Sequence, residues 1–144
     1  MKTFLLFNLA CAVALLVGCG TTMKSSAAEP AKPLTGTEWK LAEIDGKAVA
    51  VTEGLRTPML QLDSTTKRAS GTSGINRYFG SYESTGAALK FGPLAGTKMG
   101  GPPAAMAVES AFLKALASVN SFNIASNRLE LKAGDKTVLQ FQAR

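Results

Sequence analysis

The residue types that most often carry out catalysis are scarce in this sequence. Its 144 residues include no histidine, two cysteines (Cys11 and Cys19), and 10 carboxylates against 16 lysines and arginines. Histidine is the commonest general base and metal ligand near neutral pH, and the carboxylates form neither a close pair nor an EF-hand loop. The glycines form no phosphate-binding signature. We therefore expect no catalytic residue, no metal site and no cofactor, in a protein that is not an enzyme.

Residues 70–83, SGTSGINRYFGSYE, are the segment whose composition most suggests a site. Asn76 can hydrogen-bond its own backbone or adopt a left-handed conformation, and Gly74 and Gly80 allow a close backbone approach. We expect a loop here, either a corner of the fold or a contact surface for a peptide, a lipid or a protein. It could border a groove against residues 97–103. Tyr78, Phe79 and Tyr82 could lie in the core or at its rim, and if the segment is a contact surface they are the candidate contact residues.

The N-terminus predicts export. Lys2 precedes an apolar run over residues 4–17, which is too short to cross a hydrocarbon core of ~30 Å, so we expect a secretory signal over residues 1–18. The run ends in Leu-Val-Gly-Cys, which resembles the lipobox of bacterial lipoproteins. The resemblance implies that Cys19 is acylated and becomes the first residue of the mature protein. The alternative is an ordinary cleaved signal with a chance cysteine.

The residues after Cys19 predict the membrane in which the protein is anchored and the tether that joins the anchor to the folded domain. Thr21 stands where an aspartate would signal inner-membrane retention, so the lipoprotein resemblance implies the cell envelope, at an outer membrane facing the periplasm. Residues 19–33 carry almost no large apolar side chain and are typical of a lipidated cysteine followed by a flexible tether. One folded domain then remains, over residues 34–144.

The charge pattern bears on partners. The formal net charge is +6, and the basic residues are scattered along the chain without a cluster interleaved with aromatic residues. We therefore expect no nucleic-acid partner. The partners we expect are the membrane, through the N-terminal acyl chains, and an envelope protein or an apolar ligand. We expect a monomer.

Alternation of apolar and polar residues predicts strands along most of the domain. Such short half-buried strands have their apolar residues two apart, with turn residues between them. The apolar pairs are Trp39 and Leu41, Leu60 and Leu62, Leu89 and Phe91, Phe122 and Ile124, Leu129 and Leu131, and Leu139 and Phe141. We expect an α+β, mainly β fold, in which an antiparallel meander of about 7–8 short strands curves into a partly open (cracked) barrel.

One amphipathic helix, over about residues 103–120, is expected to pack on this sheet. Prolines at 102 and 103 suit a helix start, and the apolar stripe comprises Ala105, Val108, Phe112, Leu116 and Val119. Glu109 falls within the apolar arc, where a carboxylate needs a partner unless it reaches water at the edge. Arg77 is the natural partner, and the backbone N–H groups of residues 74–77 are the alternative. Glu109 would then attach the glycine-rich segment to the helix.

Four motifs occur in a characteristic order: LTGTEWKL (34–41), SGTSGINRYFGSY (70–82), TKMGGPPAAMAVESAFLKAL (97–116) and LELKAGDKTVLQF (129–141). Together they resemble the META domain, the family of HslJ-like bacterial heat-shock lipoproteins. The second resembles the family's G-x-x-G-C-N-x-x-x-G-x-Y signature and the third its T-x-M-x-C segment followed by a helix with a glutamate. The structural signature positions are Trp39, Gly71, Gly74, Asn76, Arg77, Gly80, Tyr82, Thr97, Met99 and Glu109.

Two departures from the family pattern fall together. Ile75 and Gly101 stand where the family often has cysteines, and Ile75 could fill the volume over Gly101 if those positions meet in space. The resemblance implies a non-enzymatic envelope lipoprotein with a stress-associated role. Two alternatives remain open, namely a binder of a small apolar ligand or acyl chain in a groove of the curved sheet, and a pilotin-like module for protein interaction or assembly.

Overall fold

The computed structural model describes residues 30–49 and 56–144. The expected signal (1–18), Cys19 and most of the expected tether (19–33) lie outside the described residues. The elements are β1 (Glu38–Ile44), β2 (Lys47–Ala48), β3 (Met59–Asp63), β4 (Arg68–Thr72), β5 (Arg77–Thr85), β6 (Ala88–Gly96), α1 (Pro103–Ser118), β7 (Ser121–Ala125), β8 (Arg128–Ala133) and β9 (Lys136–Ala143).

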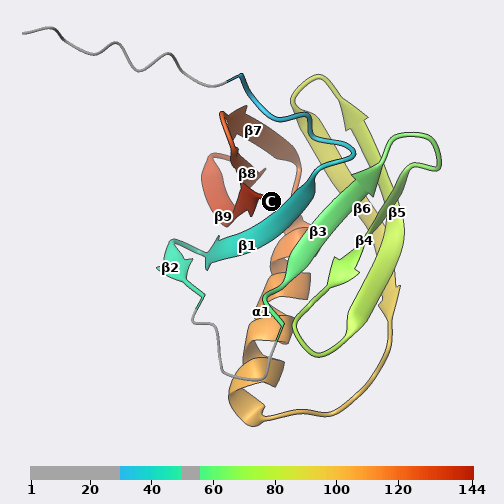
Figure 1. Cartoon of the computed structure of the whole chain (residues 1–144), viewed down its shortest axis with the longest axis vertical. Coiled ribbons are helices and arrows are strands. Elements are labelled where there is room, and N and C mark those ends of the chain that lie inside the picture. The colour runs from blue at the N-terminus through green and yellow to red at the C-terminus, as the bar shows by residue number, and fades with distance from the viewer. Residues whose placement is uncertain (1–29, 50–55) are drawn as a thin grey trace, which may run out of the picture.

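All strand pairs are antiparallel, and the strands follow one another in the order β2-β1-β3-β4-β5-β6-β7-β8-β9. A further pairing of β1 with β9 closes this sheet into a ring (Figure 1). The ring is weakest between β6 and β7, which share a single register pair, Ala88 with Ser121. The expectation of a mainly β, antiparallel α+β fold with a covering helix is confirmed, with nine strands in the described residues rather than seven or eight.

The core lies inside this ring and is built from the inward-facing residues of the strands. The apolar pairs expected from the sequence all lie in strands, and most of their members are buried. Trp39 is fully buried, and its indole N–H donates to the carbonyl of Leu34 at 3.0 Å, so the ring is buried without leaving a polar atom unpaired. The fully buried large side chains include Trp39, Leu60, Leu62, Leu89, Phe112, Leu116, Leu129, Leu131, Leu139 and Phe141.

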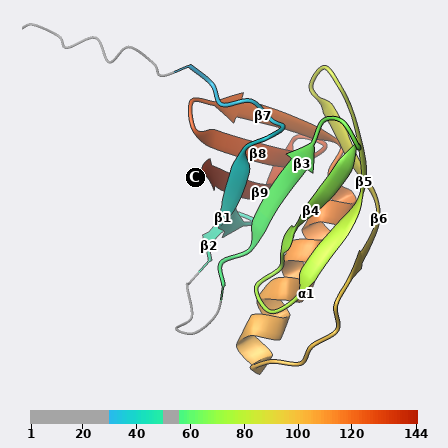
Figure 2. The same cartoon turned by 45° about the vertical axis from the view of Figure 1, so that its right-hand side comes forward.

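Helix α1 fills the open side of the ring and packs against β6, β9, β1 and β8. It begins at Pro103, whose fixed φ suits the first helical position. Its buried residues are Ala105, Glu109, Phe112, Ala115 and Leu116. Phe112 makes edge-to-face contacts with Tyr78 and Phe141, with ring centroids 5.6 and 6.2 Å apart, and so links the helix to β5 and β9. Figure 2 shows α1 behind β4, β5 and β6, whose other surface faces away from it.

The prediction of a loop over residues 70–83 is wrong for most of this segment. The segment is a hairpin of β4 and β5 joined by a turn at residues 73–76, with Thr72 paired to Arg77. The sequence did not predict these strands because Gly71 occupies an inward position, where the absence of an apolar side chain interrupts the alternation of apolar and polar residues. The Tyr78 hydroxyl passes there to donate to the Met59 carbonyl at 2.9 Å, and a Cβ on Gly71 would collide with that carbonyl.

We expect Gly71→Ala to lower the free energy of unfolding by about 1–3 kcal/mol, because the added methyl group overpacks the space between the Met59 carbonyl and the Tyr78 hydroxyl. Urea denaturation followed by circular dichroism measures this change. Ser70→Ala is the matched control on the neighbouring outward-facing position, and we expect it to stay within about 0.5 kcal/mol of the wild type. Equal stability of Gly71→Ala and the wild type would contradict this packing.

Candidate functional site

The side chain of Asn76 joins three segments of the fold. Its Nδ2 donates to Glu109 Oε1 at 2.8 Å and to the Met99 carbonyl at 3.0 Å. Its Oδ1 accepts from the Met99 N–H at 2.7 Å and from Thr97 Oγ1 at 2.8 Å. An asparagine amide has two donor hydrogens and two acceptor lone pairs, so every hydrogen-bonding position of this side chain is used. The β4–β5 turn, residues 97–99 and the helix are thereby held at one point.

Glu109 is buried on the inner side of α1, with 8% of its surface exposed. Besides the Asn76 amide, its Oε2 accepts from Ser73 Oγ at 2.8 Å and from the Asn76 backbone N–H at 3.2 Å. These donors compensate for the loss of water around the carboxylate. We call Ser73, Asn76 and Glu109, with Thr97 and Met99, the Asn76–Glu109 cluster.

The expectation that Arg77 pairs with Glu109 is wrong. Arg77 points out of β5 and is exposed, because it follows Asn76 by one residue and strand side chains alternate between faces. Within the described residues the ion pairs are Lys136–Asp45 at 2.6 Å and Arg144–Glu38 at 4.0 Å. The backbone alternative is the one the structure adopts, through the Asn76 N–H. The sequence reasoning missed the Ser73 hydroxyl and the Asn76 amide, although both lie in the segment it singled out.

The pKa of Glu109 lies below its ordinary value. Burial alone would raise this pKa, but hydrogen bonds from the side chains of Asn76 and Ser73 and from the backbone N–H groups of Asn76 and Ile75 outweigh burial. The carboxylate is therefore ionised near neutral pH and acts as an acceptor for the turn. A group held so firmly as an anion is poorly suited to exchange a proton in a reaction.

The turn at residues 73–76 has its own internal bonds. The Asn76 carbonyl accepts from the Ser73 N–H at 2.8 Å and from Thr72 Oγ1 at 3.0 Å. Gly74 has a φ of 118°, a conformation that other residues rarely adopt, so the turn requires glycine there. In the described part of the chain no buried side-chain nitrogen or oxygen lacks a hydrogen-bond partner. The Asn76–Glu109 cluster is thus a complete structural unit.

Ile75 lies directly over Gly101. A Cβ built on Gly101 would collide with Ile75 Cδ1 and would lie 3.1 Å from its Cγ1. The two positions therefore depend on each other, since a side chain at position 101 needs the space that Ile75 fills. The geometry matches the volume exchange expected from the sequence.

Of the three aromatic residues that could have formed a contact surface, two belong to the core instead. Tyr78 and Tyr82 point inward from β5 and are buried, with 3% and 1% of their surface exposed. Their hydroxyls donate to the carbonyls of Met59 and Asp63, and burial raises the pKa of Tyr78. Phe79, on the opposite face of β5, is 46% exposed. Alternation along the strand separates the three residues, since neighbours face opposite sides.

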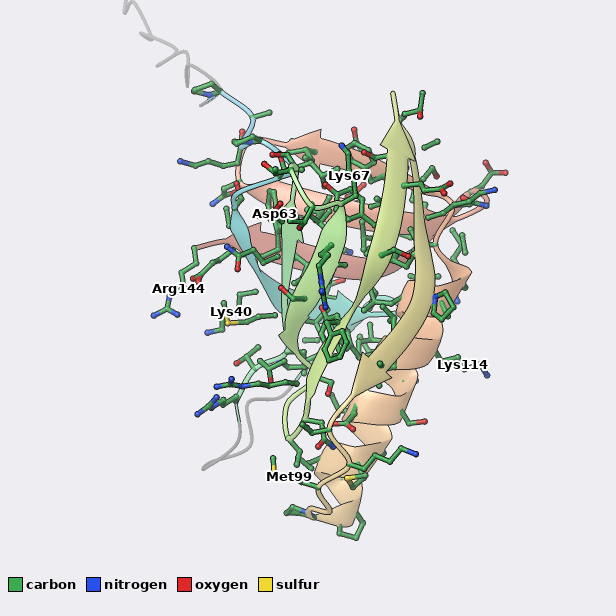
Figure 3. All side chains as sticks on the ribbon, turned by 90° about the vertical axis from the view of Figure 1, so that its right-hand side faces the viewer. Lys40, Asp63, Lys67, Met99, Lys114 and Arg144 are labelled. Atoms are coloured by element: carbon green, nitrogen blue, oxygen red, sulfur yellow. The ribbon has the colours of Figure 1, made fainter. Side chains whose placement is uncertain are left out.

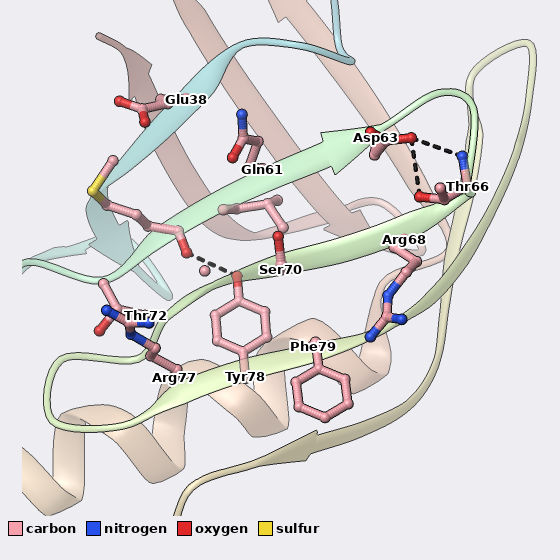
Figure 4. A pocket seen from close by; sticks show the side chains of 13 residues that line it. Glu38, Gln61, Asp63, Thr66, Arg68, Ser70, Thr72, Arg77, Tyr78 and Phe79 are labelled. Carbon is pink, nitrogen blue, oxygen red and sulfur yellow. Dashed lines mark hydrogen bonds between the residues drawn. The ribbon is translucent and has the colours of Figure 1, made fainter.

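Two neighbouring grooves lie on the outer surface of the hairpin. The larger, of about 710 Å³, crosses the outward faces of β3, β4 and β5 (Figure 4). The smaller, of about 480 Å³, lies beside the turn, between Gly74 and Ile75 on one side and Thr97 and Met99 on the other. It occupies the place where the sequence suggested a groove. Figure 3 looks onto this outer surface, with Lys40 and Met99 at its margins.

Two further observations limit the chemistry. Among residues 30–49 and 56–144, no group of three or more His, Cys, Asp or Glu side chains could hold a metal ion. Within the same ranges, no helix has the length and apolar character needed to cross a membrane.

A ring of antiparallel strands with one helix in its opening and a polar cluster under that helix defines a small mainly β domain. Residues 32–144 match the META domain family model, and the chain belongs to the META domain family. The fold is similar to the NMR structure of the protein from Burkholderia xenovorans, at 31% identity and a TM-score of 0.63, covering 84% of this chain and 94% of that chain. A second NMR structure, at 22% identity and a TM-score of 0.58, covers 76% and 90% and shows the fold alone. No curated protein matches the chain.

The cluster predicts opposite pH dependences for the wild type and for Asn76→Asp. In the wild type the pKa of Glu109 is lower in the folded state than its ordinary value of 4.5. Its ionised carboxylate therefore stabilises the fold at pH values above 4.5, and this stabilisation is lost as the pH falls below 4.5. In Asn76→Asp two carboxylates face each other and raise each other's pKa. We expect that variant to be destabilised by about 3 kcal/mol at pH 7 and to recover as the pH falls to about 5.

Urea denaturation at a series of pH values measures both slopes. Glu109→Gln is the control, because it cannot ionise and should lose the part of the acid dependence that Glu109 supplies. Parallel pH profiles for the wild type and Asn76→Asp would show that the two side chains do not interact.

The contact of Ile75 with Gly101 predicts that a disulfide can be introduced. The Cβ of Ile75 is bonded to Cγ1, which lies 3.1 Å from the built Cβ of Gly101, so the two Cβ atoms are at most about 4.6 Å apart, near the usual disulfide range. We expect Ile75→Cys with Gly101→Cys to oxidise spontaneously and to raise the free energy of unfolding by about 2–4 kcal/mol. Thiol titration and denaturation with and without reductant measure this. Gly101→Cys alone should be destabilised by its collision with Ile75, and free thiols in the double variant under air would refute the geometry.

Proposed function

We propose that this protein is a non-enzymatic lipoprotein of the bacterial envelope, anchored through Cys19, whose META domain acts by binding a partner under stress. The observation that carries the proposal is the state of Glu109, the buried carboxylate of the described residues. It accepts hydrogen bonds from Ser73 and from both the amide and the backbone of Asn76. Its ionised form is stabilised by these bonds, so its role is to hold the turn to the helix.

The N-terminal sequence supports the anchor. An apolar run precedes Gly18 and Cys19, as in lipoprotein signals, and the family match begins at residue 32. The backbone N–H of Lys32 donates to the Ser126 carbonyl at 2.8 Å, so the chain is attached to the domain by that residue. The stress-associated role follows from the resemblance to HslJ-like proteins.

The packing of the core favours a protein partner over an apolar ligand enclosed by the strands. Trp39, Phe112 and Phe141 are fully buried in the middle of the ring, where an acyl chain would otherwise lie. The grooves instead open on the outer surface, and polar side chains such as Gln61, Ser70 and Thr72 line them. Such a mixed surface suits recognition of another polypeptide better than storage of a lipid.

Replacement of Cys19 by serine tests the anchor. In the native host we expect the wild type in the membrane fraction, with an N-terminal peptide whose mass includes acyl chains, and Cys19→Ser in the soluble fraction without them. The replacement should also fail to restore growth of a deletion strain at elevated temperature. Recovery of an unacylated, soluble wild-type protein would overturn the lipoprotein proposal, and normal growth of the deletion strain would overturn the stress role.

A further inference from the structure

The outward face of the β3–β4–β5 sheet carries an unusual combination of side chains. Phe79 and Met99 are the large apolar residues that are exposed in the described part of the chain, at 46% and 56%. Phe79 lines the larger groove and Met99 the smaller, and Arg77 lines both. Arg68 also lines the larger groove (Figure 4). We call Arg68, Arg77 and Phe79 the arginine face.

The two carboxylates that line the larger groove, those of Asp63 and Glu38, already have partners. Asp63 is the register partner of Arg68 in β3 and β4, but its Oδ1 accepts from the Thr65 N–H at 2.9 Å, the Thr66 N–H at 2.7 Å and Thr66 Oγ1 at 3.0 Å. It therefore serves the β3–β4 turn. Glu38, at the far margin of the groove, faces Arg144 at 4.0 Å.

The guanidinium groups of the arginine face are left without a carboxylate among the described residues. Arg68 turns toward Phe79, with its Cζ 5.2 Å from the centre of the ring. A guanidinium that stacks on an aromatic ring keeps its N–H edge free and loses less entropy when it binds a carboxylate, because its plane is already fixed. The arginine face therefore complements an anionic ligand and offers an apolar contact between its two charges.

The register of the strands sets the spacing of that ligand. Thr72 is the register partner of Arg77, and Arg68 lies four residues before Thr72 on the same face. The Arg68 and Arg77 backbones are therefore roughly 14 Å apart, from about 3.3 Å per residue along a strand and about 4.8 Å between strands. Phe79 pairs with Ser70, midway between them along β4.

We propose that the arginine face binds an extended acidic segment of a partner protein, with the pattern acidic-x-apolar-x-acidic. In an extended chain alternate side chains point the same way, and residues four apart are separated by about 13 Å. Two carboxylates at that spacing reach Arg68 and Arg77, and the apolar residue between them covers Phe79. Ser70, a short side chain beside Phe79, leaves room for that residue.

The smaller groove extends this site. Thr72 and Arg77 line both grooves, so a chain that passes Arg77 enters the space beside Met99 and Arg56. Arg56 adds a third guanidinium without an ion pair in the described residues, and Met99 adds a second apolar contact. Arginine, methionine and aromatic side chains are enriched at the centres of protein interfaces. Two adjacent open grooves that share Thr72 and Arg77, rather than one enclosed cavity, favour a polypeptide over a small anion.

This inference deepens the proposed binding role and rests on it, but its test does not depend on the anchor. The full chain, purified in detergent, is titrated into the fluorescein-labelled peptide Ser-Glu-Ser-Leu-Ser-Glu-Ser, and anisotropy is measured at low salt. We expect saturable binding that weakens about tenfold or more in Arg68→Gln and Arg77→Gln, since each loses a charged hydrogen bond worth about 1.4 kcal/mol or more. Phe79→Ser should weaken it by a similar factor, because it removes the apolar contact and the stacking of Arg68. Lys114→Gln, which removes the same charge from the exposed side of α1, should stay within about twofold of the wild type.

Peptide controls test the pattern itself. A permuted peptide with both glutamates adjacent, and one with glutamine in place of glutamate, should each bind about tenfold more weakly. No saturable binding, equal binding of the permuted peptide, or equal weakening by Lys114→Gln would overturn the inference. Binding to vesicles of phosphatidylglycerol and phosphatidylcholine that the three variants abolish, without peptide binding, would assign the face to a membrane instead. In either case an acylated Cys19 would leave the anchor part of the proposed function standing.

Discussion

The hydrogen-bonded contact between Asn76 and Glu109 is the constraint on which the rest of this domain depends. A carboxylate beneath a helix is costly unless donors replace its water, and here one turn supplies them from the Ser73 hydroxyl and the Asn76 amide and backbone. The second N–H of the same amide donates to the Met99 carbonyl, and its oxygen accepts from the Met99 N–H and from Thr97 Oγ1. The β4–β5 turn, the chain that leads into the helix, and the helix itself therefore share one asparagine side chain.

This arrangement divides the β4–β5 hairpin into an inner side that maintains the fold and an outer side that faces solvent, where we propose that a partner binds. On β5, Tyr78 points inward and contacts Phe112 of the helix, whereas Phe79 points outward and stacks with Arg68. The inner hydroxyl and carboxylate groups already have hydrogen-bond partners, whereas the outer guanidinium groups of Arg68 and Arg77 have no ion pair among the described residues. A rigid inner anchor also keeps the outer side chains in a fixed register, which lowers the entropy cost of binding to them.

The sequence predicted well wherever an element has large apolar residues at regular spacing. All six alternating pairs lie in strands, and the amphipathic helix begins at the predicted proline. The prediction from the sequence failed for β4 and much of β5. There Gly71 and Gly80 stand at inward positions where neighbouring groups occupy the space that a side chain would need. Without apolar residues at those positions the alternation is lost, and the glycines suggest a loop. For the same reason the sequence left open whether Tyr78 and Tyr82 belong to the core or to a contact surface, and the structure places both in the core.

Local pattern thus determined which segments form strands, where the helix lies, and that a carboxylate would need a partner on its apolar side. Tertiary structure alone decided that this partner is Asn76, 33 positions earlier, and that Arg77 beside it points to solvent. It also decided that Arg68 stacks on the ring of Phe79 and forms no ion pair with Asp63, its register partner in β3. The physical reason is that periodicity is a property of neighbouring residues. The choice of a hydrogen-bond or stacking partner depends instead on which segments the closed ring of strands brings into contact.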